Sequence, residues 1–277
     1  DNSGNGSDDS VEANRSDGTA VVSWAATTAV DAGYAANTLT LTYADSSGNA
    51  VTSGTSTFTI GAHVITARAT DGSDNFETCD FIVRVADTVA PNSITCGVQS
   101  GLDADFSGNG TDDAVEATSD NAAVVSWSAT TATDAGYAAN TLTISYANAA
   151  GTTKASGDSF AVGAHTITAT ATDGSSNATT CNFSIRVADT AVPNSITCGA
   201  QSGLNADFSG NGTNDAVEAV SSNGTAAVSW TATTATDLGY AANTLTISYA
   251  NAAGTTKASG NSFAIGLHVI TATATDG

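Results

Sequence analysis

The sequence predicts an all-β protein made of tandem sandwich domains. Two observations support this prediction: the chain repeats itself about every 102 residues, and each repeat holds short runs rich in β-branched residues between Gly- and Asn-rich turns. Short strands at a spacing of roughly 8 to 12 residues are typical of β-sandwiches. No stretch carries a helical hydrophobic stripe longer than about two turns.

The repeat is visible both in whole segments and in single residues. The segment from Gly136 to Gly157 recurs unchanged from Gly239 to Gly260, and the three histidines recur at intervals of 102 and 103 residues. This spacing divides the chain into repeats at 1–88, 89–190 and 191–277, and we expect the first to be cut on its N-terminal side and the third on its C-terminal side. The chain is therefore expected to be a piece of a longer tandem array.

The elements of the second repeat follow from its composition. We expect strands at Ala122–Trp127, Thr141–Tyr146, His165–Thr172 and Cys181–Val187, because these runs are rich in β-branched residues and partly alternate apolar with small polar side chains. Before them, SITC at 93–96 is strand-like, whereas AVEA at 114–117 is long enough only for a helical turn.

One tryptophan recurs at the same strand position of each repeat, as Trp24, Trp127 and Trp230. We interpret it as a core anchor. A surface that stacks on carbohydrate is the functional alternative.

The charge balance excludes several kinds of partner. The chain of 277 residues carries 27 acidic side chains against 6 Lys and Arg, a formal net charge of −21. Such a field repels nucleic acids and anionic membrane surfaces. No segment approaches the roughly 18 to 20 consecutive apolar residues of a membrane-spanning helix, so we expect no membrane insertion.

A family resemblance is visible in the runs VVSW, TTATDAG, SGDSFAVGAHTITATATDGSSNATTCNFSIRVADT and VPNSITC. Together they resemble the hyalin repeat, in the paired cysteines, the Gly before the penultimate strand and the ATDGSSN turn. The resemblance implies tandem immunoglobulin-like β-sandwich domains in an extracellular or cell-surface protein of adhesive or structural type, with no catalytic activity. The chain departs from the family between Cys96 and Val124, where it is about ten residues longer, and this insert carries the acids.

The insert has the pattern D-x-S-x-N-G-x-x-D-x-x-E in all three repeats. This pattern fits an EF-hand-type calcium loop, in which positions 1, 3, 5 and 9 give side-chain oxygens, position 7 a backbone carbonyl and position 12 a bidentate Glu, with Gly at position 6 for the sharp turn. All of these ligands are hard oxygen donors, which favours calcium over zinc or copper. The predicted ligands are Asp1, Ser3, Asn5, Ser7, Asp9 and Glu12; Asp105, Ser107, Asn109, Thr111, Asp113 and Glu116; and Asp207, Ser209, Asn211, Thr213, Asp215 and Glu218.

The alternative is an acidic, Gly-rich, solvated loop that binds nothing. The twelve-residue calcium loop could also be aligned with Asp103 at position 1. This alignment is disfavoured, because the third repeat has Asn205 at that position and no Glu then falls at position 12. The three loops hold 11 of the 27 acidic residues, so we read much of the negative charge as a calcium signature.

The junctions between repeats are a second candidate metal site. If the strands run as in an immunoglobulin sandwich, the linker Asp87 approaches Asp134 and Asp173 of the next repeat. Asp189 approaches Asp237 and Asp276 in the same way. Calcium bridging these groups would stiffen the junction, and ordinary turn-capping by Asp is the alternative.

Four cysteines in a repeat of secreted type suggest disulfides. A Cys96–Cys181 bond would join the first and last strands of the second repeat and is the pairing we favour. The alternative, Cys79–Cys96 with Cys181–Cys198, would span a junction and require an extended strand to bring its far end back.

These features predict a structural protein: a calcium-rigidified tandem-repeat segment of a cell-surface fibre, filament or adhesin stalk. Its partners would be neighbouring copies of the same repeat or subunit, in one giant chain or joined by strand donation. The alternative is a binding module that recognises a glycan or a cell-surface protein. No set of residues with catalytic spacing stands out, so an enzyme is not expected.

Overall fold

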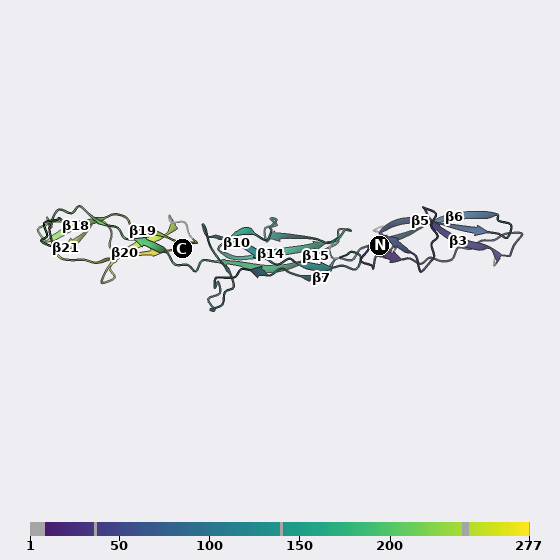
Figure 1. Ribbon diagram of the computed structural model, residues 1–277, viewed down its shortest axis with the longest axis horizontal. Coiled ribbons are helices and arrows are strands. Elements are labelled where there is room, and N and C mark those ends of the chain that lie inside the picture. Colours follow the sequence, from purple (N-terminus) through teal and green to yellow (C-terminus); the bar gives the residue numbers. More distant parts are fainter. Residues whose placement is uncertain (1–8, 36–37, 139–140, 240–243, 277) are drawn as a thin grey trace. The chain divides into compact units, whose positions relative to one another are not determined.

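The structure, a computed structural model, describes residues 9–35, 38–138, 141–239 and 244–276. Its regular elements in these ranges are β-strands, and no α-helix occurs among them (Figure 1). The strands form several sheets, as tandem β-sandwich domains require. The predicted all-β class is confirmed.

The strands follow the predicted repeats along the chain. The first repeat contains β1 Val11–Glu12, β2 Thr19–Val21, β3 Thr40–Asp45, β4 Thr57–Thr59, β5 Gly61–Thr70 and β6 Phe76–Ala86. The second contains β7 Asn92–Thr95, β8 Gln99–Ser100, β9 Val115–Glu116, β10 Ala122–Trp127, β11 Thr131–Thr133, β12 Thr143–Asn148, β13 Asp158–Ala161, β14 Gly163–Thr172 and β15 Ala178–Ala188. The third contains β16 Asn194–Thr197, β17 Gln201–Ser202, β18 Thr225–Trp230, β19 Thr234–Thr236, β20 Thr246–Asn251, β21 Asn261–Ala264 and β22 Ile270–Thr275.

Two four-stranded sheets have the same order, β3-β5-β6-β1 in the first repeat and β12-β14-β15-β9 in the second. The pairings β3–β5, β5–β6 and β12–β14 are antiparallel, whereas the short strands β1 and β9 run parallel to β6 and β15. Smaller sheets complete the repeats: β2-β4, β8-β10-β13, β17-β18-β21, β20-β22, β7-β11 and β16-β19. In the second repeat the parallel edge strand β9 consists of the last two residues of the acidic insert. Its pairing with β15 therefore fixes the position of Glu116.

The core of the first repeat shows how the alternating pattern becomes burial. Ile65, Val83 and Val85 are buried with Phe58 and Ala20, and the partly buried Trp24 packs against this cluster. In β14 every second side chain from Ile167 to Ala171 is fully buried. The period of two in the sequence therefore places one face of each long strand in the core.

The recurring tryptophan is a core residue. Trp127 is 6% exposed and lies edge-to-face on Phe160 with 6.2 Å between ring centroids. Trp24 packs in the same manner on Phe58, and Trp230 on Phe263. The core-anchor interpretation is confirmed for Trp127, whose ring is not on the surface where a sugar could stack.

The sequence located most of the longer second-repeat strands, although β14 and β15 begin two and three residues earlier than expected and the short strands β8, β11 and β13 were not predicted. The strand expected at Thr141–Tyr146 begins two residues later, as β12, and the AVEA segment forms β9 instead of a helical turn. The expectation of a helical turn was wrong because Val115 and Glu116 pair with Val187 and Ala188 of β15, a partner far away in sequence.

The chain divides into two compact units. One contains 1–98, 128–155 and 166–183, and the other contains 99–127, 156–165 and 184–277. The first unit includes the junction between the first and second repeats, and the second unit includes the junction between the second and third. The division into domains at 1–88, 89–190 and 191–277 stays a prediction.

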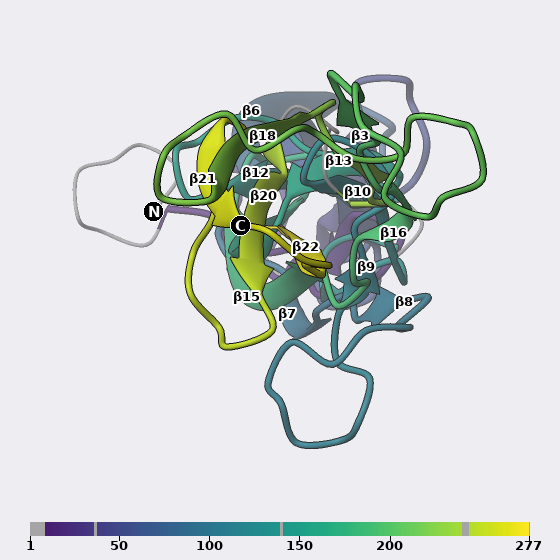
Figure 2. The same cartoon turned by 90° about the vertical axis from the view of Figure 1, so that its left-hand side faces the viewer.

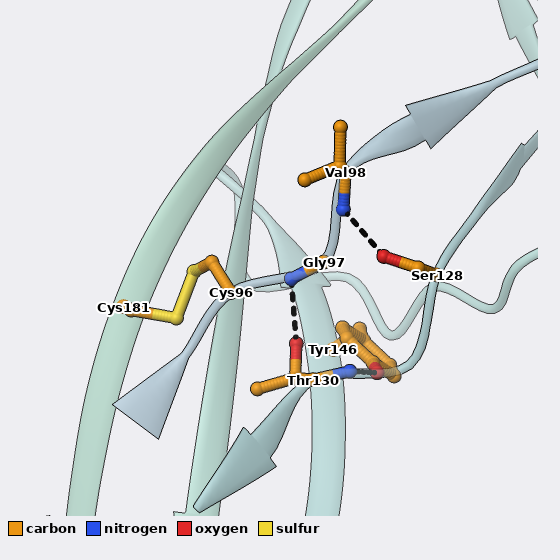
Figure 3. The surroundings of a disulfide bond; sticks show 7 residues. All are labelled: Cys96, Gly97, Val98, Ser128, Thr130, Tyr146 and Cys181. Carbon is orange, nitrogen blue, oxygen red and sulfur yellow. Dashed lines mark hydrogen bonds between the residues drawn. A yellow bond between two sulfur atoms is a disulfide. The ribbon is translucent and has the colours of Figure 1, made fainter. Parts of the chain in front are cut away.

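A disulfide joins Cys96, directly after β7, to Cys181 in β15, with 5.9 Å between the Cα atoms (Figure 3). Hydrogen bonds next to it fix the same stretch of chain. The Gly97 N–H donates to Thr130 Oγ1 at 3.0 Å, and the Val98 N–H donates to Ser128 Oγ at 2.9 Å (Figure 3). The favoured pairing is confirmed, and Cys79 and Cys198 are free and exposed.

Candidate metal-binding sites

The base of the second acidic loop is a small buried contact. Ala104 and Ala114 form a β-bridge, with Ala104 donating and accepting backbone hydrogen bonds of 2.9 to 3.1 Å. Both side chains are buried against Ala188 at the end of β15. The small residues let the loop close tightly on the sheet, and the loop beyond them projects away from the neighbouring strands after β8 (Figure 2).

Asp105, at loop position 1, organises the tip. Its carboxylate accepts hydrogen bonds from the N–H groups of Gly108 at 2.7 Å, Asn109 at 3.2 Å and Gly110 at 2.6 Å. Gly110 has φ of +83°, a left-handed conformation that suits the Gly required at position 6. The Gly110 N–H and the other loop donors hold the pKa of Asp105 below its ordinary value although partial desolvation opposes them.

The third loop has the same construction. Asp207 accepts from Gly210 at 2.7 Å, Asn211 at 3.1 Å and Gly212 at 2.7 Å, and Gly212 has φ of +84°. Two loops that share one geometry 102 residues apart indicate that the sequence pattern specifies this conformation.

Asp113, at position 9 of the loop, forms an ion pair with an arginine side chain. Its Oδ1 accepts from the Phe106 N–H at 2.8 Å, and its Oδ2 lies 3.1 Å from Nη1 of Arg186 in β15. Asp215 accepts from Phe208 at 2.7 Å in the same way. Sequence reasoning missed Arg186, although Arg84 and Arg186 recur at equivalent positions among only 6 basic residues.

The last loop residue, Glu116, is turned to the linker. Its carboxylate accepts from the Thr190 N–H at 2.8 Å, the Thr190 hydroxyl at 2.6 Å and the Ala191 N–H at 3.2 Å. Burial acts to raise its pKa, but the hydrogen bonds with Thr190, Ala191 and Asp189 together outweigh burial, so the pKa is lowered. In the first repeat Glu12 holds Thr88 by the corresponding two bonds, both 2.8 Å.

The structure thus brings the predicted ligands of the second loop into two groups. Asp105, Ser107 and Asn109 share the loop tip, where the Ser107 hydroxyl lies 3.4 Å from Asp105 Oδ1 and Asn109 Oδ1 accepts from the Thr111 N–H at 2.8 Å. Glu116 lies with the linker, and its N–H donates to Asp103 Oδ1 at 2.7 Å. Asn205 makes the same bond to Glu218 at 2.7 Å, so position 103 requires only a side-chain oxygen acceptor.

In the first loop, Asp1, Ser3, Asn5 and Ser7 lie outside the described residues, which include Asp9 and Glu12. The remaining predicted ligands of the third loop, Ser209, Thr213, Asp215 and Glu218, lie within the described part. The donors fit calcium in kind, because all are carboxylate, amide, hydroxyl or carbonyl oxygens.

The linker carboxylates lie where the sandwich topology predicts. Asp87, Asp134 and Asp173 each offer a carboxylate oxygen, and these oxygens lie within 4.8 Å of one another. Among the residues that the structure describes, Asp105, Asp113 and Glu116 do not form such a group.

Fold and sites together define a tandem array of immunoglobulin-like sandwiches with acidic inserts and acidic junctions. The family model of the HYR (hyalin repeat) domain matches residues 4–85 and 109–187, and the chain belongs to this family. HYR domains are non-enzymatic, immunoglobulin-like modules found in extracellular, adhesion-type proteins. A search of curated proteins found no match. In the described part of the chain, no helix has the length and apolarity needed to cross a bilayer.

Proposed function

We propose that this chain is a segment of an extracellular structural fibre, filament or adhesin stalk, in which the acidic loops bind calcium and rigidify a tandem array. The observation that carries the proposal is the shared construction of the loops around Asp105 and Asp207. In each, three backbone amides gather on the first carboxylate and a left-handed Gly stands at position 6. This shared construction supports the proposal, because a calcium loop of this type requires Gly at position 6 for its sharp turn.

Calcium would act on the array by charge neutralisation and mass action. A bound ion removes the repulsion between the clustered carboxylates, and a ligand that binds only the folded state stabilises it in proportion to the logarithm of its free concentration. Glu116 connects the loop to the linker, because its carboxylate accepts hydrogen bonds from Thr190 and Ala191. Entry of Glu116 into a calcium shell would exchange these hydrogen bonds for cation contacts.

Calcium titration of the full chain by isothermal calorimetry tests the proposal. Asp105→Asn removes the first ligand of the second loop, whereas the control Asp112→Asn removes the same charge at loop position 8, where the third repeat naturally has Asn214. We expect Asp105→Asn to weaken one class of sites more than about tenfold and Asp112→Asn to have a small electrostatic effect. Equal effects of the two substitutions would support the solvated-loop alternative and overturn the proposal.

A further inference from the structure

The junction between the first two repeats contains a buried group of three carboxylates from three separate segments. Asp87 follows β6, Asp134 follows β11 and Asp173 follows β14, and one oxygen of each lies within 4.8 Å of the others. Asp87 is 6% exposed and Asp173 is 7% exposed. Three like charges at this separation repel one another strongly when they are removed from water.

Each carboxylate is held by backbone amides through one oxygen. Asp134 Oδ1 accepts from Gly136 at 2.7 Å and Tyr137 at 3.0 Å, and Asp87 Oδ1 accepts from Val89 at 3.2 Å. The Oδ2 atoms of Asp87 and Asp134 are buried and have no hydrogen-bond partner. Turn-capping by Asp therefore explains the Oδ1 contacts but leaves the two inward oxygens unexplained.

Asp173 completes the set and is also fixed. Its Oδ1 accepts from Ser175 at 2.8 Å and Asn177 at 2.9 Å, and its Oδ2 accepts from the Asn177 side chain at 3.0 Å. The same Asn177 amide donates to the backbone carbonyl of Asp87 at 3.1 Å. Asn177 thus ties the linker backbone at Asp87 to the turn that holds Asp173.

The charged groups that act on Asp87 are all acidic. Burial, together with the carboxyl groups of Glu12, Asp134 and Asp173, raises the pKa of Asp87 to about 6, against the lowering effect of the hydrogen bond from Val89.

At both junctions a glycine of the following repeat lies close against the linker carboxylate. A Cβ atom on Gly136 would lie 3.0 Å from Asp87 Cγ and 3.1 Å from Asp87 Oδ2, so Gly is needed for the turn to approach the linker. A Cβ on Gly239 would meet Asp189 even more closely, at 2.8 Å from Cγ.

At the second junction Asp189, Asp237 and Asp276 occupy the corresponding positions, but among the described residues their oxygens do not all lie within 4.8 Å of one another. Both oxygens of Asp189 are buried and without a hydrogen-bond partner. Burial raises the pKa of Asp189 to about 6, with further contributions from Glu116, Asp237 and Asp276. In the first repeat the equivalent turn residues Asp31 and Asp71 meet no linker carboxylate among the described residues, and the pKa of Asp71 is lowered by the Asn75 side chain.

We propose that Asp87, Asp134 and Asp173 bind a divalent cation of the calcium type at the junction of the first two repeats, and that Asp189, Asp237 and Asp276 bind a second ion at the next junction. The donors are oxygens only, as hard cations prefer, and water completes the shell. The ion cross-links the linker to two turns of the following repeat. This inference does not depend on calcium binding by the acidic loops.

The test measures calcium stoichiometry on the full chain by equilibrium dialysis, for the wild type and for Asp87→Asn/Asp189→Asn. We expect this variant to bind about two ions fewer per chain. Asp31→Asn/Asp71→Asn, the matched control at turns without a linker carboxylate, should keep the wild-type number. The Asp105→Asn/Asp207→Asn loop variant should keep the junction ions. The experiment therefore tests calcium binding at the junctions separately from calcium binding by the loops.

Thermal unfolding separates loss of the ion from loss of the fold. In EDTA, Asp87→Asn/Asp189→Asn should melt at or above the wild-type temperature, because it removes uncompensated buried charge. With calcium present it should gain less than the wild type. Unchanged stoichiometry, or a variant that melts lower in EDTA and gains as much from calcium as the wild type, would overturn the proposal.

Discussion

Glu116 and Thr190 lie 74 residues apart in the sequence and are joined by two hydrogen bonds, at 2.8 Å to the Thr190 amide and 2.6 Å to its hydroxyl. The pair connects the end of the acidic loop to the first residues of the linker, next to Asp189. Glu12 and Thr88 repeat it in the preceding repeat. The end of each of these two acidic loops is therefore hydrogen-bonded to the residue that follows the linker carboxylate Asp87 or Asp189.

This contact gives Glu116→Gln a defined outcome. If Glu116 also closes the calcium shell of the second loop, as the twelve-residue spacing predicts, the substitution should weaken calcium binding by that loop about tenfold or more. Calorimetry on the Asp207→Asn background isolates the second loop from the third. Unaltered affinity would show that Glu116 serves the linker alone.

Arg186 competes with any cation for Asp113. Arg186→Gln removes the ion pair of 3.1 Å and adds one unit of negative charge to the site. Since a partly exposed pair of this kind contributes up to about 1 kcal/mol, we expect calcium to bind the second loop up to about fivefold more tightly. Calorimetry at two salt concentrations measures this, with Arg68→Gln as the control of equal charge. A weaker affinity after Arg186→Gln would contradict the competition.

The Cys96–Cys181 bond closes a loop with a sequence separation of 85 residues. Cys96→Ser/Cys181→Ser should lower the free energy of unfolding of the second repeat by about 2–5 kcal/mol, because the unfolded chain gains conformational freedom. Urea unfolding followed by Trp127 fluorescence measures the change. Exposed Cys79 and Cys198 should react with a thiol reagent without prior reduction, and protection of either one would contradict the structure.

Asp45 provides a pH prediction apart from the proposed metal sites. Its carboxylate accepts from Ser47, from the Asn49 N–H and from the Asn49 side chain, and the Asn49 side chain is the main cause of a lowered pKa. A lowered folded-state pKa contributes stability above the unfolded value of about 4, which is lost as the pH falls through the folded pKa.

Asp45→Asn, the residue that occupies this turn as Asn148 and Asn251, should therefore lose less stability between about pH 5 and pH 3 than the wild type. Urea unfolding at each pH tests it. Identical pH profiles would contradict the role of Asp45.

The sequence predicted what depends on local pattern. The alternation of HTITATAT placed β14, and D-x-S-x-N-G placed the loop tip around Asp105. The topology of a sandwich even predicted the approach of Asp87 to Asp134 and Asp173, because turns at one pole of a domain face the linker. These features follow from periodicity and fold alone.

Pairings between residues far apart in the sequence could not be predicted from local pattern. β9 is two residues long, too short for any periodicity, and it exists because β15 offers it a parallel partner. The contact of Glu116 with Thr190 follows from that pairing and not from the loop. The only sequence feature that points to Arg186 is its recurrence: Arg84 stands at the equivalent position of the first repeat, in a chain with few basic residues.

Differential scanning calorimetry of the full chain, with saturating calcium and with EDTA, tests the central claim most directly. One ion at about a hundredfold over its dissociation constant adds about 2.7 kcal/mol to the folded state, so the unfolding midpoint should rise clearly with calcium. Magnesium, which demands a tighter octahedral shell, should raise the midpoint less. Identical midpoints in calcium and EDTA would contradict the account.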